Sequence, residues 1–163
     1  MISFNVSFCG KPNNYGIIDK YVSRSAQPQK EDFAWLKEQG ITDVFNFRTM
    51  YEKNINFEEE AEVIKQGLKY HHIPSYTRNP SIENIEKFLT EINEIKNKNG
   101  KAHIHCKAGA DRTGMYAFIY KMLNNIGTLA ENEKEWFKFG HHYELFPNLI
   151  EWTEKLLNSG KLK

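Results

Sequence analysis

The feature of this sequence that most constrains its fold is a regular alternation of short strand-like runs with amphipathic helical segments. Runs rich in β-branched and aromatic residues predict strands at residues 4–8, 20–23, 41–47, 68–73 and 101–105. Apolar residues at helical spacing predict helices at residues 29–39, 57–66, 82–99, 113–125, 129–139 and 147–158. This order predicts an α/β fold with a central, mostly parallel sheet flanked by helices, to which the first strands add an antiparallel edge.

The length and the charge of the chain limit the number of domains and the kinds of partner that it can have. A chain of 163 residues without repeats or linkers predicts one domain spanning residues 1–163. Its 22 basic and 21 acidic residues nearly cancel, so a nucleic-acid partner is not expected. No apolar run approaches the ~20 residues of a membrane span, so integral membrane association is not expected either. The first residues lack the pattern of a signal peptide, and we expect a cytoplasmic monomer.

The two cysteines of the chain, Cys9 and Cys106, do not form a disulfide framework. This usage suits a reducing compartment. Cys9 is expected to be a packing residue, and a protective disulfide between Cys9 and Cys106 under oxidation is left open.

Residues 105–114 read HCKAGADRTG and lie between a predicted strand and a predicted apolar helix. In a strand–turn–helix arrangement, successive backbone N–H groups curl inward and form an anion-binding nest at the positive end of the helix. Arg112 adds a planar guanidinium that can bind two phosphate oxygens at once. The expected phosphate-binding residues are therefore Lys107, Ala108, Gly109, Ala110 and Arg112.

Cys106 lies at the bottom of this predicted nest. A thiol with a pKa near ~8.5 is only a few per cent thiolate at neutral pH, so it must be activated. A helix end supplies at most ~2 kcal/mol, and we expect the loop N–H groups, Arg112 and the Thr113 hydroxyl to supply the rest. Cys106 would then attack phosphorus, and water would hydrolyse the cysteinyl-phosphate while Thr113 stabilises the departing sulfur. His105 is expected to hold the loop by bonding backbone, and no metal or cofactor is required.

This segment resembles the HCxxGxxR[ST]G signature of protein tyrosine and dual-specificity phosphatases. Upstream, YVSRSAQPQKEDFAWLKEQGITDVFNFR (residues 21–48) is similar to the entry segment of small atypical dual-specificity phosphatases. The resemblance covers most of residues 21–122. It implies the cysteine-phosphatase fold, Cys106 as the nucleophile and Arg112 as the phosphate clamp. Arg48 matches an arginine of that entry segment, and we interpret it as structural.

The usual general acid is missing. Many relatives carry an aspartate in the loop before the helix that precedes the catalytic strand, but residues 73–81, IPSYTRNPS, contain no carboxylate. Asp111 is the substitute candidate, because a side chain on the loop rim can reach the leaving oxygen. Phosphatases of the myotubularin type and bacterial enzymes reading HCxxGxDRTG are similar at this position, and the resemblance implies that Asp111 is the acid.

Several alternatives remain open at this point. The substrate could be a phosphorylated protein, a phosphoinositide or an inositol phosphate; Lys107 could favour acidic ligands, and Arg78 could reach a substrate phosphate. More remote readings are a phosphate-binding pseudophosphatase and a rhodanese-like sulfurtransferase. The histidines at 71, 72, 103, 141 and 142 match no standard metal spacing and are interpreted as strand or surface residues.

Overall fold

The computed structural model describes residues 10–52 and 55–162, and within these ranges five strands form one sheet. Its order is β1-β2-β5-β3-β4, in which β1 and β2 are antiparallel and all other neighbours are parallel. The strands are β1 (Gly16–Ile17), β2 (Val22–Ser25), β3 (Asp43–Asn46), β4 (Lys69–His72) and β5 (Ala102–His105). The predicted mostly parallel sheet with an antiparallel edge is therefore confirmed.

The edge itself differs from the prediction. β1 lies at residues 16–17, where no strand was expected, and β2 begins two residues later than expected. The expected strand at residues 4–8 and Cys9 lie outside the described residues. β1 was missed because two paired residues are too short to show the alternation by which a strand is recognised.

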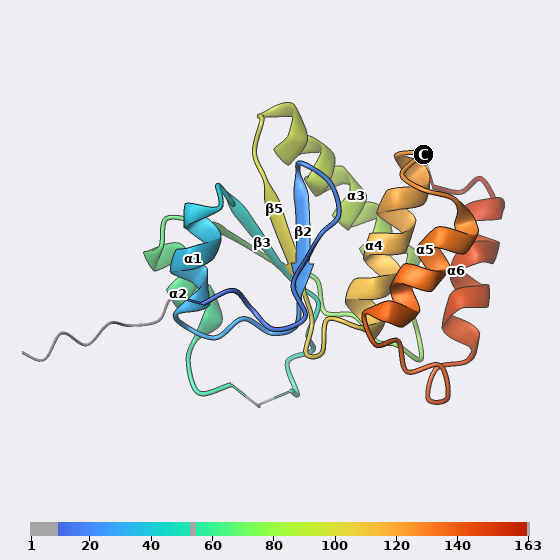
Figure 1. Ribbon diagram of the computed structural model, residues 1–163, viewed down its shortest axis with the longest axis horizontal. Coiled ribbons are helices and arrows are strands. Elements are labelled where there is room, and N and C mark those ends of the chain that lie inside the picture. The colour runs from blue at the N-terminus through green and yellow to red at the C-terminus, as the bar shows by residue number, and fades with distance from the viewer. Residues whose placement is uncertain (1–9, 53–54, 163) are drawn as a thin grey trace, which may run out of the picture.

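Six helices within the described ranges follow the predicted pattern closely. They are α1 (Asp32–Glu38), α2 (Glu59–Lys65), α3 (Ile82–Asn97), α4 (Asp111–Leu123), α5 (Leu129–Lys138) and α6 (Asn148–Asn158). Figure 1 shows α1 and α2 on one side of the sheet, and α4, α5 and α6 on the other. The expected cap is present on α3, since the Ser81 hydroxyl accepts a hydrogen bond from the Asn84 N–H at 3.2 Å.

Two apolar cores lie on the two faces of the sheet. Phe33, Leu36, Val44 and Val63 belong to the smaller core beneath α1 and α2. Phe45, the residue after Val44, belongs to the larger core formed with α3, α4, α5 and α6. Successive strand residues therefore serve opposite cores, as period-two alternation requires of a sheet covered on both faces.

The central position of β5 determines where the HCKAGADRTG loop lies. His105, the last residue of β5, is level with Ser25 of β2 and with Asn46 of β3. The chain then turns through residues 106–110 and enters α4 at Asp111. The loop thus leaves the carboxyl end of the middle strand, where ligands of parallel α/β sheets bind.

Candidate active site

The carbonyl groups of the loop all point outward and are bonded there. Each carbonyl of residues 106–110 accepts a hydrogen bond from a group outside the loop. The donors, in loop order, are His105 Nδ1 (3.2 Å), the Gln27 N–H (3.0 Å), Asn14 Nδ2 (3.0 Å), Arg24 Nη2 (2.8 Å) and Trp136 Nε1 (3.1 Å). Among the described residues, the N–H groups of residues 107–112 donate to no carbonyl. With the carbonyls bonded outward, these N–H groups are free to bind an anion.

Gly109 is required by the close packing of this loop on β2. Its φ is +69°, and a Cβ built there would lie 2.5 Å from the backbone of Ser25 and Ala26. Only glycine combines this left-handed conformation with so close an approach of two backbones. Ser25 is itself held by the buried imidazole of His103, whose Nε2 is 2.7 Å from the Ser25 hydroxyl. Burial, together with the charge of His105, lowers the pKa of His103 well below its usual value.

His105 joins the loop to a buried polar cluster formed by Glu59, Gln27 and Asn46. Its Nε2 lies 2.6 Å from Glu59 Oε1, while Glu59 Oε2 accepts hydrogen bonds from Gln27 and Asn46 at 3.0 Å. Burial alone would raise the pKa of Glu59, but the charge of His105 and these hydrogen bonds more than offset it and lower the pKa. The expected bond from His105 to the loop backbone is present, at the carbonyl of Cys106.

Cys106 is 2 % exposed and lies close to two arginines. Arg24 is buried beneath the loop, with its guanidinium 3.9 Å from the centre of the Phe139 ring. Burial lowers the pKa of Arg24 to about 10, against the opposing charges of Glu135 and Cys106. The cysteine sulfur thus lies in a positive environment to which Arg24, not expected from the sequence, contributes beside Arg112.

Arg112 is held in place by a carboxylate that the sequence did not single out. Its Nη1 and Nη2 both donate to Glu52, the second at 3.1 Å. Burial lowers the pKa of Arg112, and the contacts with Glu52 and Cys106 more than offset this and raise it. Glu52 is fixed in turn by Arg48, which is buried and donates to the Glu52 carbonyl at 3.1 Å. Arg48 is therefore structural, as interpreted from the sequence.

Asp111, the candidate acid, is turned toward the segment that follows α5. Its Oδ1 accepts hydrogen bonds from His141 Nδ1 at 2.7 Å and from the His142 N–H at 2.8 Å. Its Oδ2 lies 2.8 Å from His142 Nδ1. Burial would raise the pKa of Asp111, and the bonds with the two histidines more than offset it and lower the pKa. The description of His141 as a surface residue is wrong, because it is buried beneath this carboxylate.

The remaining predicted site residues fall into two groups. Thr113 is fully buried, and its hydroxyl has no hydrogen-bond partner within the described part of the chain. Lys107 and Ala108 are exposed at the loop surface, whereas Ala110 is buried beside Trp136. The loop therefore presents backbone and Lys107 to a ligand, and keeps Thr113 beneath it.

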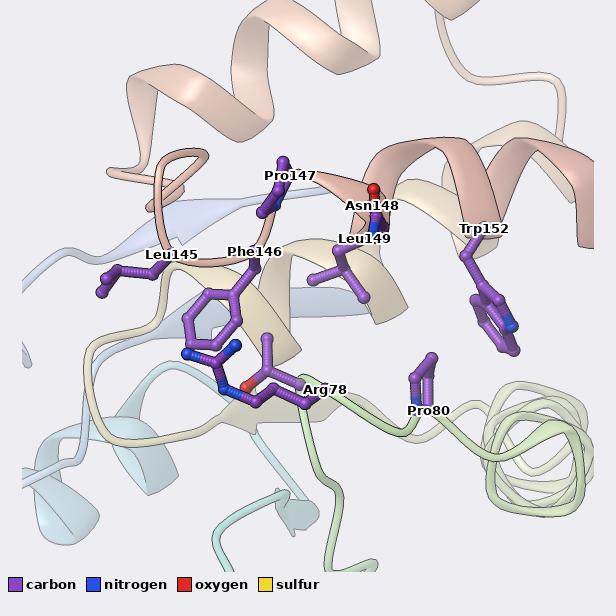
Figure 2. Close-up of a pocket in the computed structure, with 9 residues that line it drawn as sticks. Arg78, Pro80, Leu145, Phe146, Pro147, Asn148, Leu149 and Trp152 are labelled. Carbon is purple, nitrogen blue, oxygen red and sulfur yellow. The ribbon is translucent and has the colours of Figure 1, made fainter.

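A cavity of about 290 Å³ adjoins Arg112. Its lining combines two arginines with small polar groups, one carboxylate and aromatic rings: Thr49, Glu52, Ser75, Tyr76, Thr77, Arg78, Arg112 and Phe146. Thr77, Arg78 and Phe146 also line an adjacent groove of about 170 Å³, shown in Figure 2. In this view the Arg78 guanidinium lies beside the Phe146 ring, at 5.2 Å from its centre, and Leu149 and Trp152 of α6 lie farther along.

Sequence reasoning missed the residues that fix the loop from a distance: Asn14, Arg24, Glu52, Trp136, His141 and His142. No local pattern marks them, because each acts through a contact with a residue far along the chain. Arg24 and Gly109, for example, are 85 residues apart. The available signal was Arg24 itself, which lies between two serines in β2. A charged side chain in a buried strand needs a partner, and this predicts a contact elsewhere in the fold.

Comparison with known proteins agrees with this geometry. Residues 19–125 match the model of a family described as "Polymorphic toxin system, DSP-PTPase phosphatase". The tyrosine-protein phosphatase CDC14 of Candida albicans is 30% identical over 109 residues, which cover 62% of this chain and 20% of that protein. The matched stretch thus spans about a fifth of that relative's length.

Two solved structures share the fold. Pseudomonas aeruginosa TpbA in complex with pTyr superposes with a TM-score of 0.69 at 16% identity, covering 90% of this chain and 91% of the other. The catalytic core of the Saccharomyces cerevisiae PP-IP phosphatase SIW14, in complex with citrate, gives a TM-score of 0.71 at 20% identity, with coverages of 91% and 93%.

The chain therefore belongs to the DSP-PTPase phosphatase family, and its sheet and helices have the architecture of dual-specificity phosphatases. Among residues 10–52 and 55–162, no three or more His, Cys, Asp and Glu side chains are grouped so as to hold a metal ion. None of the described helices is both long and apolar enough to cross a bilayer.

Proposed function

We propose that this protein hydrolyses phosphate monoesters through a cysteinyl-phosphate on Cys106. The observation that carries the proposal is the loop itself, whose carbonyls are bonded outward at five successive residues while its N–H groups are left free. A phosphoryl group seated there would accept those N–H bonds and bonds from the guanidinium N–H groups of Arg112 that do not donate to Glu52. These donors stabilise the charge on the equatorial oxygens as phosphorus is transferred.

The reaction has two steps. In the first, the Cys106 sulfur attacks phosphorus, an S–P bond forms, and the P–O bond to the leaving group breaks as the leaving oxygen takes up a proton. In the second, water attacks the cysteinyl-phosphate, the S–P bond breaks, and inorganic phosphate leaves. The Thr113 hydroxyl, which has no hydrogen-bond partner among the described residues, lies in the first turn of α4 and is available to donate to the departing sulfur.

The proton of the first step is proposed to come from the group built around Asp111. This residue directly precedes Arg112 and is bonded to His141 and His142, whereas residues 73–81 supply no carboxylate. Asp111 and the phosphate clamp are then adjacent, in the first turn of α4. This arrangement replaces the mobile aspartate loop of many relatives.

The lining of the cavity favours a substrate with an aromatic or apolar group next to its phosphate. Tyr76 and Phe146 line the cavity, and its charged groups are two arginines and Glu52. An inositol ring with many phosphates needs more cations than this and is repelled by a carboxylate. We therefore place phosphotyrosine in proteins first, as in the TpbA complex with pTyr, and inositol phosphates, suggested by SIW14, second.

The direct test is hydrolysis of para-nitrophenyl phosphate in the presence of EDTA by the wild-type protein and by Cys106→Ser. We expect activity that is insensitive to EDTA and is abolished by the substitution. Phosphotyrosine peptide and inositol hexakisphosphate, compared at equal concentration, then separate the two substrate classes. Full activity in Cys106→Ser would exclude the thiolate mechanism.

A further inference from the structure

We propose that His142 is the side chain that delivers the proton to the leaving oxygen, and that Asp111 positions it. This inference rests on the proposed phosphatase function and assigns the chemistry within the Asp111 group. Asp111 is then a positioning residue, and His142 is the catalytic one.

The first argument is that neither oxygen of Asp111 is free. Oδ1 accepts from His141 Nδ1 and from the His142 backbone, and Oδ2 faces His142 Nδ1 at 2.8 Å. A carboxyl group can give a proton to a substrate only from an oxygen that carries it, and here both oxygens accept from nitrogen donors. The same contacts suit a carboxylate that remains ionised and orients an imidazole, as in a histidine–aspartate pair.

The second argument selects one histidine of the two. The side chain of His141 is 0% exposed, and its Nε2 has no hydrogen-bond partner among the described residues. Its ring is tilted against that of Trp136, with ring centres 4.9 Å apart and an angle of 39° between the planes, and this burial keeps it from a ligand. The side chain of His142 is 50% exposed, so its second nitrogen is open to solvent while the first is held by Asp111.

The third argument places His142 beside the phosphate-binding loop. Asn14 Nδ2 bonds both the Ala108 carbonyl and the Phe139 carbonyl, and this joins the segment after α5 to the loop. The Phe146 N–H donates to the His142 carbonyl at 3.0 Å, and Phe146 lines the cavity that contains Arg112. The segment that carries His142 is therefore bonded to the loop on one side and to a residue of the cavity wall on the other.

The proton balance follows from these contacts. His142 enters the first step with protons on both nitrogens, Nδ1–H bonded to Asp111 and Nε2–H directed to the leaving oxygen. It gives the Nε2 proton to that oxygen as the P–O bond breaks, and Asp111 remains a carboxylate throughout. In the second step the neutral Nε2 takes a proton from the attacking water, and the original state is restored.

The test is His142→Gln, because glutamine keeps an N–H for Asp111 but cannot give up a proton. We expect hydrolysis of phenyl phosphate, which has a poor leaving group, to fall by on the order of 10²-fold or more. Hydrolysis of para-nitrophenyl phosphate should fall by less than about 10-fold, because that leaving group needs little protonation. If His142 is the acid, kcat/KM of the wild type should decrease toward high pH, and this decrease should be absent from the variant.

Glu144→Gln is the matched control, since Glu144 is exposed, charged and two residues away in the same segment. It should retain wild-type rates on both substrates. Within the described residues, Asp111 of α4 is the charged side chain bonded to His142, and His141 is the titratable neighbour bonded to the same carboxylate. The double variant Asp111→Asn, His142→Gln should be no slower than the slower single variant, because the two residues act as one unit.

Equal losses on the two substrates, or wild-type rates on both, would overturn the assignment to His142. Neither result would touch the proposed function as long as Cys106→Ser remains inactive. An active Cys106→Ser would instead remove the function on which this inference rests.

Discussion

The phosphate-binding loop and the rim around it are built in different ways. The loop and its flanking residues are one continuous stretch, residues 105–113, in which Cys106 and Thr113 are buried and each carbonyl of residues 106–110 accepts a hydrogen bond. The rim joins Asp111 to segments that lie far from it in sequence, and His142 and Arg78 are both exposed there. In the proposed mechanism, one short motif therefore supplies the groups for anion binding, whereas proton donation and substrate choice depend on distant segments.

The largest loss of activity is expected for a substitution of Arg112 in the loop region. Arg112→Lys keeps the charge but loses the planar pair of donors, so kcat/KM for para-nitrophenyl phosphate should fall by on the order of 10²- to 10³-fold. Steady-state kinetics measure the loss, and thermal unfolding shows whether the variant is folded. A change of less than about 3-fold would mean that a point charge is enough and that bidentate binding does not matter.

Gly109→Ala should be the next most damaging change, because it attacks the packing of the loop rather than its charge. The left-handed conformation costs a non-glycine residue about 1–2 kcal/mol, and the new Cβ would lie 2.5 Å from the backbone of Ser25. We expect a loss of unfolding free energy of about 2–5 kcal/mol in urea titrations.

Gly160→Ala is the control for that substitution. Gly160 has a similar φ, +67°, but nothing lies within 4 Å of a Cβ built there. Its cost should therefore be only the conformational part, about 1 kcal/mol. Equal costs at the two positions would show that close packing of the loop on β2 contributes nothing.

A smaller effect is expected on the rim at Arg78. This residue is exposed and lines both the cavity and the adjacent groove. Arg78→Gln should raise KM for an acidic phosphotyrosine peptide by about 2- to 5-fold, the size of an exposed ionic contact. The kinetics of para-nitrophenyl phosphate should change less, because that substrate has no acidic side chain to pair with Arg78. A decrease of kcat on the small substrate would mean instead that Arg78 takes part in catalysis at the loop.

The smallest effect concerns stability, at a histidine remote from the loop. His71 lies between Asp43 and Glu91, at 2.7 and 2.9 Å, and these contacts outweigh burial and raise its pKa above 6.5. A histidine with a raised pKa contributes stability that is fully present below its unfolded pKa and is lost as pH rises through the folded value. From about pH 6.5 upward the wild type should lose about 1 kcal/mol or less through this group.

His71→Gln should remove this slope, which urea titrations at several pH values would show, while the pH profile of activity is unchanged. A variant with the same slope as the wild type would assign the pH dependence of stability to another group. The prediction also separates the pH profile of folding from that of catalysis at His142.

Much of the fold could be predicted because its signals are local. The helices begin and end close to their predicted limits, and the buried character of α4 is evident from its apolar sequence. Cys106, Arg112 and Gly109 could be located as well, since one motif contains them. Glu52, Arg24 and Trp136 could not, because their role exists only once α5, β2 and the loop are packed together. The cytoplasmic location and the monomeric state stay predictions.

The measurement that tests the central claim most directly is trapping of the intermediate. A phosphotyrosine peptide labelled with ³²P is mixed with the protein, and the reaction is stopped with acid within milliseconds. The protein is then digested, and the fragment that carries the label is identified by mass spectrometry. The account predicts transient label on Cys106 in the wild type and none in Cys106→Ser. Label on another residue, or turnover without any labelled protein, would contradict it.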